Sequence, residues 1–111
     1  MITSINLFNT SFPPTNKERI DLLFQCNTVT IERICSSGSS SPEGFWYDQP
    51  TDEWVVVLQG SAGLSIEGEP ETRTLKPGEA IFLPAHHRHR VEWTEAQTLW
   101  LAVHIKIENN S

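Results

Sequence analysis

The chain has 111 residues, of which 38% are hydrophobic and 20% charged, so it has room for one domain with one modest core. Its net charge of −6 argues against non-specific binding to nucleic acid and to anionic membranes. No apolar run approaches the roughly 20 residues that span a bilayer, and the first residues do not resemble a secretory signal, so we expect a cytoplasmic protein.

Residues 1–27 are expected to form an N-terminal arm beside the main body of the protein. Two consecutive prolines exclude a helix in the middle of this arm. After them, Thr15 or Asn16 is suited to cap a short helical turn over residues 17–20. The apolar run that follows is too short for its periodicity to distinguish a helix from a strand.

Residues 28–107 are expected to form the barrel, because they contain short segments rich in β-branched and aromatic residues separated by turns. We predict strands over residues 28–34, 54–58, 62–66, 71–75, 80–83, 91–94 and 99–107. The second and third of these strands are joined by only three residues and are expected to form a hairpin. The sequence Lys76-Pro77-Gly78-Glu79 is typical of a type II turn. This pattern indicates an all-β antiparallel sandwich or barrel.

Two predicted strands are apolar at every position, which indicates that both of their faces are covered. These segments are residues 54–58 and residues 99–103. One face would fill the barrel, and the other needs a second layer that a small chain can hardly supply. We therefore predict a homodimer that packs sheet against sheet. The alternative is that the N-terminal arm covers this face within the monomer.

The two cysteines, Cys26 and Cys35, are too few for a disulfide scaffold and lack the spacing of a metal site. We expect both to be reduced and to have packing roles, as is usual in the cytoplasm, with a single disulfide as the alternative.

Three of the four histidines lie between Pro84 and Val91, in the sequence Pro-Ala-His-His-Arg-His-Arg-Val. Neutral imidazole is the commonest protein ligand for transition metals and the commonest acid or base near neutral pH. If the protein catalyses a reaction, these histidines are the first candidates to take part in it.

The spacing of Glu, Gly, Pro and His residues resembles the two motifs of the cupin superfamily, in particular its small single-domain members. The first motif reads His-x-His, three or four residues, Glu, six residues, Gly, and Glu53 and Gly60 match its second half. The second motif reads Gly, five residues, Pro-x-Gly, two residues, His, three residues, Asn. Gly78, Pro84 and His89 match most of it. This resemblance implies a double-stranded β-helix, or jelly roll, with a pocket at one end.

The same motifs also show where this chain departs from the family. Cupins usually hold one metal ion with two His and one Glu from the first motif and one His from the second. Of these four ligands, only Glu53 and His89 carry over by position. The two first-motif histidines are replaced by Tyr47 and Gln49, or by Trp46 and Asp48, depending on the spacing used. His86 stands where the family has glycine, and Trp93 stands where it has the final Asn.

Strand alternation indicates which of these residues share a face and are suited to hold a metal. If His89 points into the barrel, His87 and Val91 share its face, whereas His86, Arg88 and Arg90 face outward. A site of Glu53, His87 and His89, with Asp48 or Gln49 as a fourth donor, suits a divalent Fe, Mn, Ni or Zn ion. The alternative is that residues 86–90 form a solvated loop and that Glu53 pairs with a nearby cation.

Other side chains are candidates for contacts with a substrate, each with an ordinary structural role as the alternative. Tyr47 could donate a hydrogen bond or act as a general acid. The candidates for substrate binding are Trp46, Gln49, Arg88 and Trp93, with Trp100 as a further aromatic wall. His104 alternates with Ala102 and Trp100, and we expect a satisfied core or surface histidine, with a pocket wall as the alternative.

The leading functional hypothesis is a metal-dependent enzyme for a small polar metabolite, of the isomerase or dioxygenase kind, resembling mannose-6-phosphate isomerase-like cupins. A metal-free cupin that binds a small ligand is the competing hypothesis. The third is a structural or partner-binding dimer without chemistry. Loss of the first-motif histidines favours the last two hypotheses, and the retained Glu53 with His87 and His89 favours the first.

Overall fold

The computed structural model describes residues 1–107, and these contain eight β-strands and no helix. The strands are β1 (Glu18–Gln25), β2 (Val29–Ser36), β3 (Thr51–Gln59), β4 (Ala62–Ile66), β5 (Arg73–Leu75), β6 (Ala80–Leu83), β7 (His89–Thr94) and β8 (Thr98–Lys106). The described part of the chain accordingly offers no helix of the length and apolarity needed to cross a membrane.

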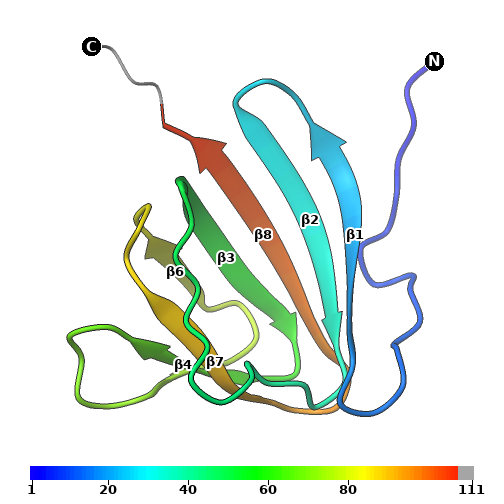
Figure 1. Cartoon of the computed structure of the whole chain (residues 1–111). Coiled ribbons are helices and arrows are strands. Elements are labelled where there is room, and N and C mark those ends of the chain that lie inside the picture. The colour runs from blue at the N-terminus through cyan, green and yellow to red at the C-terminus, as the bar shows by residue number, and fades with distance from the viewer. Residues whose placement is uncertain (108–111) are drawn as a thin grey trace.

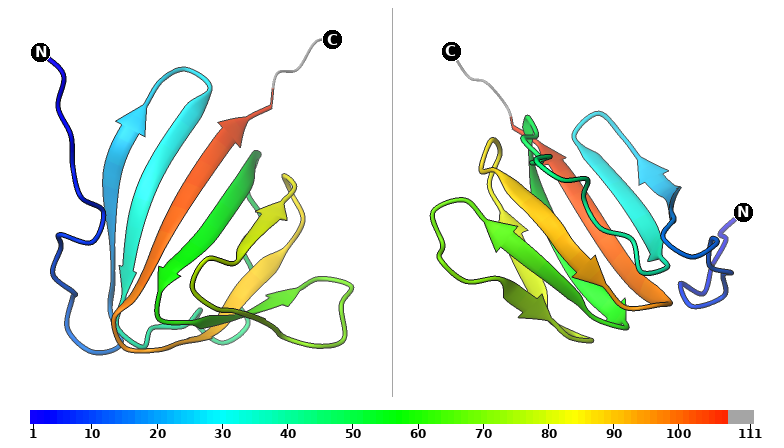
Figure 2. Two further views of the ribbon diagram at one scale, coloured as in Figure 1. Left: turned by 180° about the vertical axis from the view of Figure 1, so that it is seen from behind. Right: turned by 60° about the horizontal axis from the view of Figure 1, so that its bottom comes forward.

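The strands form two antiparallel sheets that face each other as in a jelly roll (Figures 1 and 2). The larger sheet has the order β1-β2-β8-β3-β6, and the smaller one has the order β5-β4-β7. The core lies between them, where Val57 and Trp100 of the larger sheet pack with Leu64 and Ile66 of the smaller one. The predicted all-β jelly roll is therefore confirmed.

Strand β1 corrects two expectations about the start of the chain. Residues 17–20 do not form a helical turn, because Glu18 to Gln25 pair with β2 and extend the larger sheet. The pairing places Ile20 opposite Ile34, two β-branched residues that suit a pleated surface better than a helix. The N-terminal arm therefore ends before Glu18 and not at residue 27.

The predicted hairpin between β3 and β4 is also wrong. β3 pairs with β6 and β8, whereas β4 pairs with β5 and β7 in the other sheet. The two residues between them, Gly60 and Ser61, carry the chain from one sheet to the other, and Gly60 adopts a positive φ of 77° at this crossing. The type II turn at residues 76–79 is confirmed, with Gly78 at φ 87° and a hydrogen bond from the Glu79 amide to the Lys76 carbonyl.

Strand alternation decides which residues of the larger sheet face the core. In β3, Glu53, Val55 and Val57 are buried, whereas Trp54 between them is 40% exposed. Glu53 pairs with His104 of β8 across the strands, so both side chains emerge on the inner face. The site described below is built on this pair.

The cysteines are both free thiols, as predicted. Cys35 is fully buried in β2 and has a packing role, but Cys26 is exposed and has none.

Candidate active site

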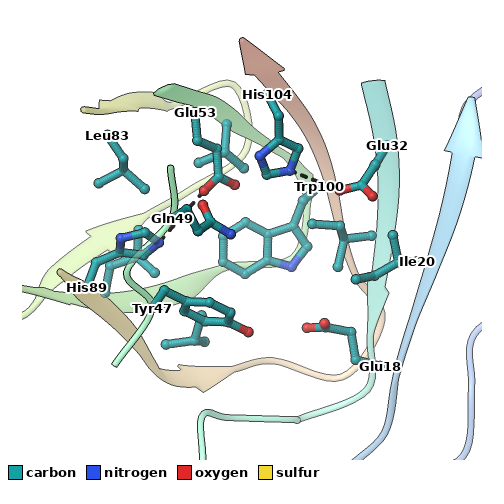
Figure 3. A pocket seen from close by; sticks show the side chains of 14 residues that line it. Glu18, Ile20, Glu32, Tyr47, Gln49, Glu53, Leu83, His89, Trp100 and His104 are labelled. Atoms are coloured by element: carbon teal, nitrogen blue, oxygen red, sulfur yellow. Dashed lines mark hydrogen bonds and ion pairs between the residues drawn. The ribbon is translucent and has the colours of Figure 1, made fainter. Parts of the chain in front are cut away.

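A cavity of about 100 Å³ lies between the two sheets, beside the outer strands β1 and β2. Figure 3 shows side chains from both sheets converging on it. Its lining combines apolar walls with a polar group of glutamates, histidines, a tyrosine and a glutamine. The polar and aromatic lining residues are Glu18, Glu32, Tyr47, Gln49, Glu53, His89, Trp100 and His104.

Glu53 provides the carboxyl group at the centre of this polar group. Its side chain is only 10% exposed, and it has no hydrogen-bond partner within residues 1–107. The nearest imidazole nitrogen, Nε2 of His89, lies 3.7 Å from its Oε1 atom. Burial raises the pKa of Glu53 above its ordinary value, and the neighbouring His104 and His89 oppose that shift. The Glu53 carboxyl therefore keeps its proton to a higher pH than an exposed glutamate does.

His89 is fixed by its backbone and by its ring. The amide groups of His89 and Tyr47 each donate to the other's carbonyl, and the two rings stack with centroids 5.3 Å apart. The Nδ1 atom lies 3.1 Å from the carbonyl oxygen of His87. Because a carbonyl only accepts hydrogen bonds, Nδ1 carries the hydrogen, and in the neutral ring Nε2 presents its lone pair to Glu53.

His104 approaches Glu53 from the adjacent strand. Its Nε2 atom lies 2.9 Å from Oε1 of Glu32, and an ionised carboxylate only accepts, so Nε2 carries the hydrogen. The other ring nitrogen faces the Glu53 side of the cavity (Figure 3). Glu53 thus lies between two imidazoles, each oriented by an acceptor on its far side. This is an arrangement suited to passing a proton.

Tyr47 and Gln49 complete the polar wall opposite the larger sheet. Burial, followed by the negative charges of Glu18 and Glu53, raises the pKa of Tyr47, so its hydroxyl keeps its proton and serves as a donor. The side-chain oxygen of Gln49 is buried without a hydrogen-bond partner in the described structure. An unmatched buried acceptor costs free energy unless a ligand or a water molecule supplies a donor.

Four of the residues predicted for metal or substrate binding thus line the cavity, namely Tyr47, Gln49, Glu53 and His89. The prediction that His89 and Val91 share the inward face is also confirmed.

His87 does not share that face, because β7 begins only at His89 and the residues before it form a loop. His86 has a φ of 61° in this loop, which explains why the family places glycine there. His87 is exposed, and its Nε2 atom lies 3.0 Å from the carbonyl oxygen of Glu67. The predicted alternation fails here because the segment bends before it becomes a strand.

Four further candidates also lie outside the cavity lining. Asp48 forms an exposed ion pair of 2.7 Å with His86. Arg88 pairs with Glu67, and its guanidinium lies over the ring of Trp46. Trp93 is 38% exposed and covers Gly63 on the smaller sheet. These contacts give all four residues structural roles on the surface.

The cavity holds only part of the metal centre that the resemblance implies. Within residues 1–107, no group of three or more His, Cys, Asp or Glu side chains is arranged to hold a metal ion. Glu53 and His89 are together, but His87 and Asp48 point elsewhere. The positions of the two first-motif histidines are occupied by Tyr47 and Gln49, both in the cavity wall.

Sequence reasoning missed two polar residues of the site, Glu18 and Glu32, and gave a place in the pocket wall only as the alternative for His104. Glu18 was hidden by the incorrect helical turn. The prediction for His104 favoured an ordinary core or surface histidine, and the structure supports the alternative of a pocket wall. Alternation on β8 with Trp100 was the available signal, but it could not show that Glu53 lies directly opposite.

Comparisons with known proteins agree with this fold. Residues 37–104 match the family model described as a cupin domain. A crystal structure of a candidate mannose-6-phosphate isomerase from Ralstonia eutropha JMP134 is 44% identical, covers 96% of this chain and 100% of its own, and has a TM-score of 0.91. A cupin superfamily protein of Desulfitobacterium hafniense DCB-2 is 20% identical, with a TM-score of 0.73 over 86% of this chain and 83% of its own.

A curated relative, the 3-hydroxyanthranilate 3,4-dioxygenase of Paraburkholderia phytofirmans, is 35% identical over 60 residues. These residues are 52% of this chain and 34% of the relative, so the match spans about a third of the relative's length. The family match covers more than half of the chain and includes Tyr47, Glu53, His89 and His104. The chain therefore belongs to the cupin domain family.

Proposed function

We propose that this cupin binds a small polar metabolite in the cavity and moves a proton on it, as an isomerase does. The main observation that supports this proposal is the buried carboxyl of Glu53, which lacks a hydrogen bond and lies between the imidazoles of His89 and His104. Such a carboxyl takes a proton from a carbon acid in its ionised form and returns it in its protonated form. The name of the Ralstonia relative supports the isomerase class.

The remaining side chains have matching roles in such a reaction. A proton shift next to a carbonyl group places negative charge on the carbonyl oxygen, and the Tyr47 hydroxyl is a donor that can stabilise it. Glu32 accepts the Nε2–H of His104, so the bare ring nitrogen lies on the Glu53 side of the cavity (Figure 3). Apolar side chains, among them Val55 and Leu83, form the rest of the cavity wall.

Proton exchange with solvent tests this proposal directly. The full-length protein is incubated in D2O with dihydroxyacetone, D-mannose or D-glucosamine, and loss of the proton next to the carbonyl is followed by NMR. We expect catalysed exchange with at least one compound and its loss in Glu53→Gln. Glu71→Gln is the matched control, because Glu71 is exposed and lines no cavity. No exchange with any of them, or unchanged exchange in folded Glu53→Gln, would contradict the proposal.

A metal-dependent enzyme, of the isomerase or dioxygenase kind, is the second candidate function. This candidate is favoured because Glu53 and His89 lie together, and both match ligand positions of the family. The dioxygenase named among the relatives supports the same class. Elemental analysis of the untagged protein separates the two candidates. Stoichiometric Fe, Mn, Ni or Zn that disappears in His89→Ala would favour the metal enzyme over metal-independent proton transfer.

A further inference from the structure

The cavity is lined by acidic side chains and by no basic side chain of Lys or Arg. Three glutamates reach it from three different strands, Glu18 from β1, Glu32 from β2 and Glu53 from β3. Glu32 is matched by His104, Glu18 accepts a hydrogen bond of 3.5 Å from the Ser36 hydroxyl, and Glu53 has only the imidazoles of His89 and His104 beside it in the described structure. The electrostatic field inside the cavity therefore favours a positively charged ligand over a negatively charged one.

The arginines of the chain are all engaged elsewhere, so none is available to turn into the cavity. Arg19 and Arg33 both bind Asp21 on the outer face. The other three bind neighbouring glutamates: Arg73 binds Glu69, Arg88 binds Glu67, and Arg90 binds Glu92. Of the lysines, only Lys17 lies near, and it lines a separate adjoining cavity formed with the serines of residues 39–41.

Two acceptors in the cavity lack hydrogen-bond donors. Glu53 is nine-tenths buried and has no hydrogen bond, and the buried side-chain oxygen of Gln49 has none either. The Gln49 oxygen needs a donor from whatever fills the cavity, because an unmatched buried acceptor is unfavourable, and the Glu53 carboxyl offers a further acceptor there. A phosphate or carboxylate ligand brings further acceptors and would leave this need unmet.

Two aromatic rings line the part of the cavity in which a positively charged group of a ligand would lie. Figure 3 shows the Tyr47 hydroxyl and the Glu18 carboxyl turned toward each other beside the ring of Trp100. The indole N–H of Trp100 already donates to Ser36, so this side chain offers the cavity its ring. Aromatic faces attract ammonium groups, most strongly where water is excluded.

We propose that the ligand of this cavity carries a protonated amino group, which lies between Glu18 and the rings of Tyr47 and Trp100. This inference rests on the proposed function in that the other end of the ligand reaches Glu53, where the proton is moved. A ligand with a protonated amino group differs in charge from a sugar phosphate, which is the kind of substrate that the name of the Ralstonia relative indicates. The ligand class is a small amine with a hydroxyl or carbonyl group near the nitrogen.

Three probes of similar size test the sign of the charge that the cavity accepts. Ethanolamine is cationic at pH 7, ethylene glycol is neutral and glycolate is anionic, and each suits a cavity of about 100 Å³. Each is titrated into the full-length protein while the Trp100 indole N–H is followed by NMR. We expect ethanolamine to bind about tenfold more tightly than ethylene glycol, which corresponds to about 1.4 kcal/mol, and glycolate to cause no shift. Glu18→Gln should remove the tenfold preference, and Glu71→Gln should keep it.

Three outcomes would overturn the inference. They are equal binding of ethanolamine and ethylene glycol, no response to ethanolamine, and binding of glycolate at least as tight as that of ethanolamine. None of these results bears on the exchange reaction in D2O, which depends on Glu53. Conversely, an amine preference without catalysed exchange would contradict the proposed proton transfer and leave the ligand class standing.

Discussion

Glu53 contributes to the candidate site at a cost in stability. Burial raises its pKa, so the folded chain keeps a proton at pH values at which the unfolded chain has released it. The folded state then binds more protons than the unfolded state. The free energy of unfolding therefore falls as pH rises from about the ordinary value of 4.5 through the raised folded-state pKa.

Glu53→Gln should therefore stabilise the protein at neutral pH. We expect a gain on the order of 1 kcal/mol, because the amide has no charge to desolvate. The gain should shrink as pH falls below the ordinary pKa of the carboxyl, where the native glutamate is protonated in both states. Urea denaturation at several pH values measures it, with Glu71→Gln as control. A gain that does not change with pH would show that Glu53 is not the titrating group.

The two imidazoles beside Glu53 should adopt opposite tautomers. His89 faces a carbonyl with Nδ1 and His104 faces a carboxylate with Nε2, so the hydrogen lies on Nδ1 in His89 and on Nε2 in His104. The ring 15N chemical shifts at neutral pH report these states directly. In the Glu32→Gln variant we expect His104 to lose its strong preference for the Nε2–H tautomer, whereas His89 should keep its preference for the Nδ1–H tautomer. The same tautomer in both rings would contradict the proton path through Glu53.

At the scale of whole elements, the crossing from β3 to β4 depends on Gly60. Its φ is 77°, and a Cβ atom there would lie 2.8 Å from the backbone Cα of Thr98. Thr98 is fully buried, and its hydroxyl donates to the carbonyls of Ser61 and Glu95, so it has little room to move. The glycine matched by the family motif is thus required by a close approach of two chain segments as well as by φ.

Gly60→Ala should lower the free energy of unfolding by about 2–4 kcal/mol, the sum of the strain at positive φ and the clash with Thr98. Gly44→Ala is a matched control, because Gly44 has the same φ of 77° and nothing within 4 Å of the added Cβ atom. The control should cost only the strain, about 1 kcal/mol. Thermal and urea unfolding measure both. Equal losses would mean that contact with Thr98 is unimportant.

At the scale of the whole molecule, the outer face of the larger sheet has no second layer over much of its area. Trp54 and Phe82 lie opposite each other on β3 and β6, and they are 40% and 53% exposed. Ile105 of β8 is 39% exposed on the same face. The N-terminal arm lies beside β1 and β2 instead, where the carbonyls of Leu7 and Ser11 accept bonds from Arg33 and Arg19. The arm therefore leaves this apolar area uncovered.

We propose that a second copy of the chain covers this face, which is a sheet-on-sheet homodimer. The face is apolar and continuous across neighbouring strands, which is typical of an interface between copies. Light scattering after size exclusion should show a dimer at micromolar concentration. Phe82→Glu should convert it to a monomer, and Ile5→Glu in the exposed arm should not. A monomeric wild-type protein would refute the dimer.

Strand patterning in the sequence was sufficient for the fold and for part of the site. Seven strands were predicted with small errors at their ends, because alternation and turn residues act locally. Glu53 and His89 were found by motif spacing, which reflects positions on strands. The hairpin at residues 59–61 was wrong because a short connection can join two strands of one sheet or cross between sheets. Only packing distinguishes these two cases.

The sequence by itself indicated an all-β barrel and placed Glu53 and His89 at two ligand positions of the cupin motifs, because motif spacing reflects positions along the strands. Only the tertiary structure decided which side chains join them. It brought Glu18, Glu32 and His104 into the cavity from strands distant in sequence, and it left His87 in a bent loop. The physical reason is that pairing between distant strands, and the bend before β7, depend on the packing of the whole chain. Local preferences do not encode either of them.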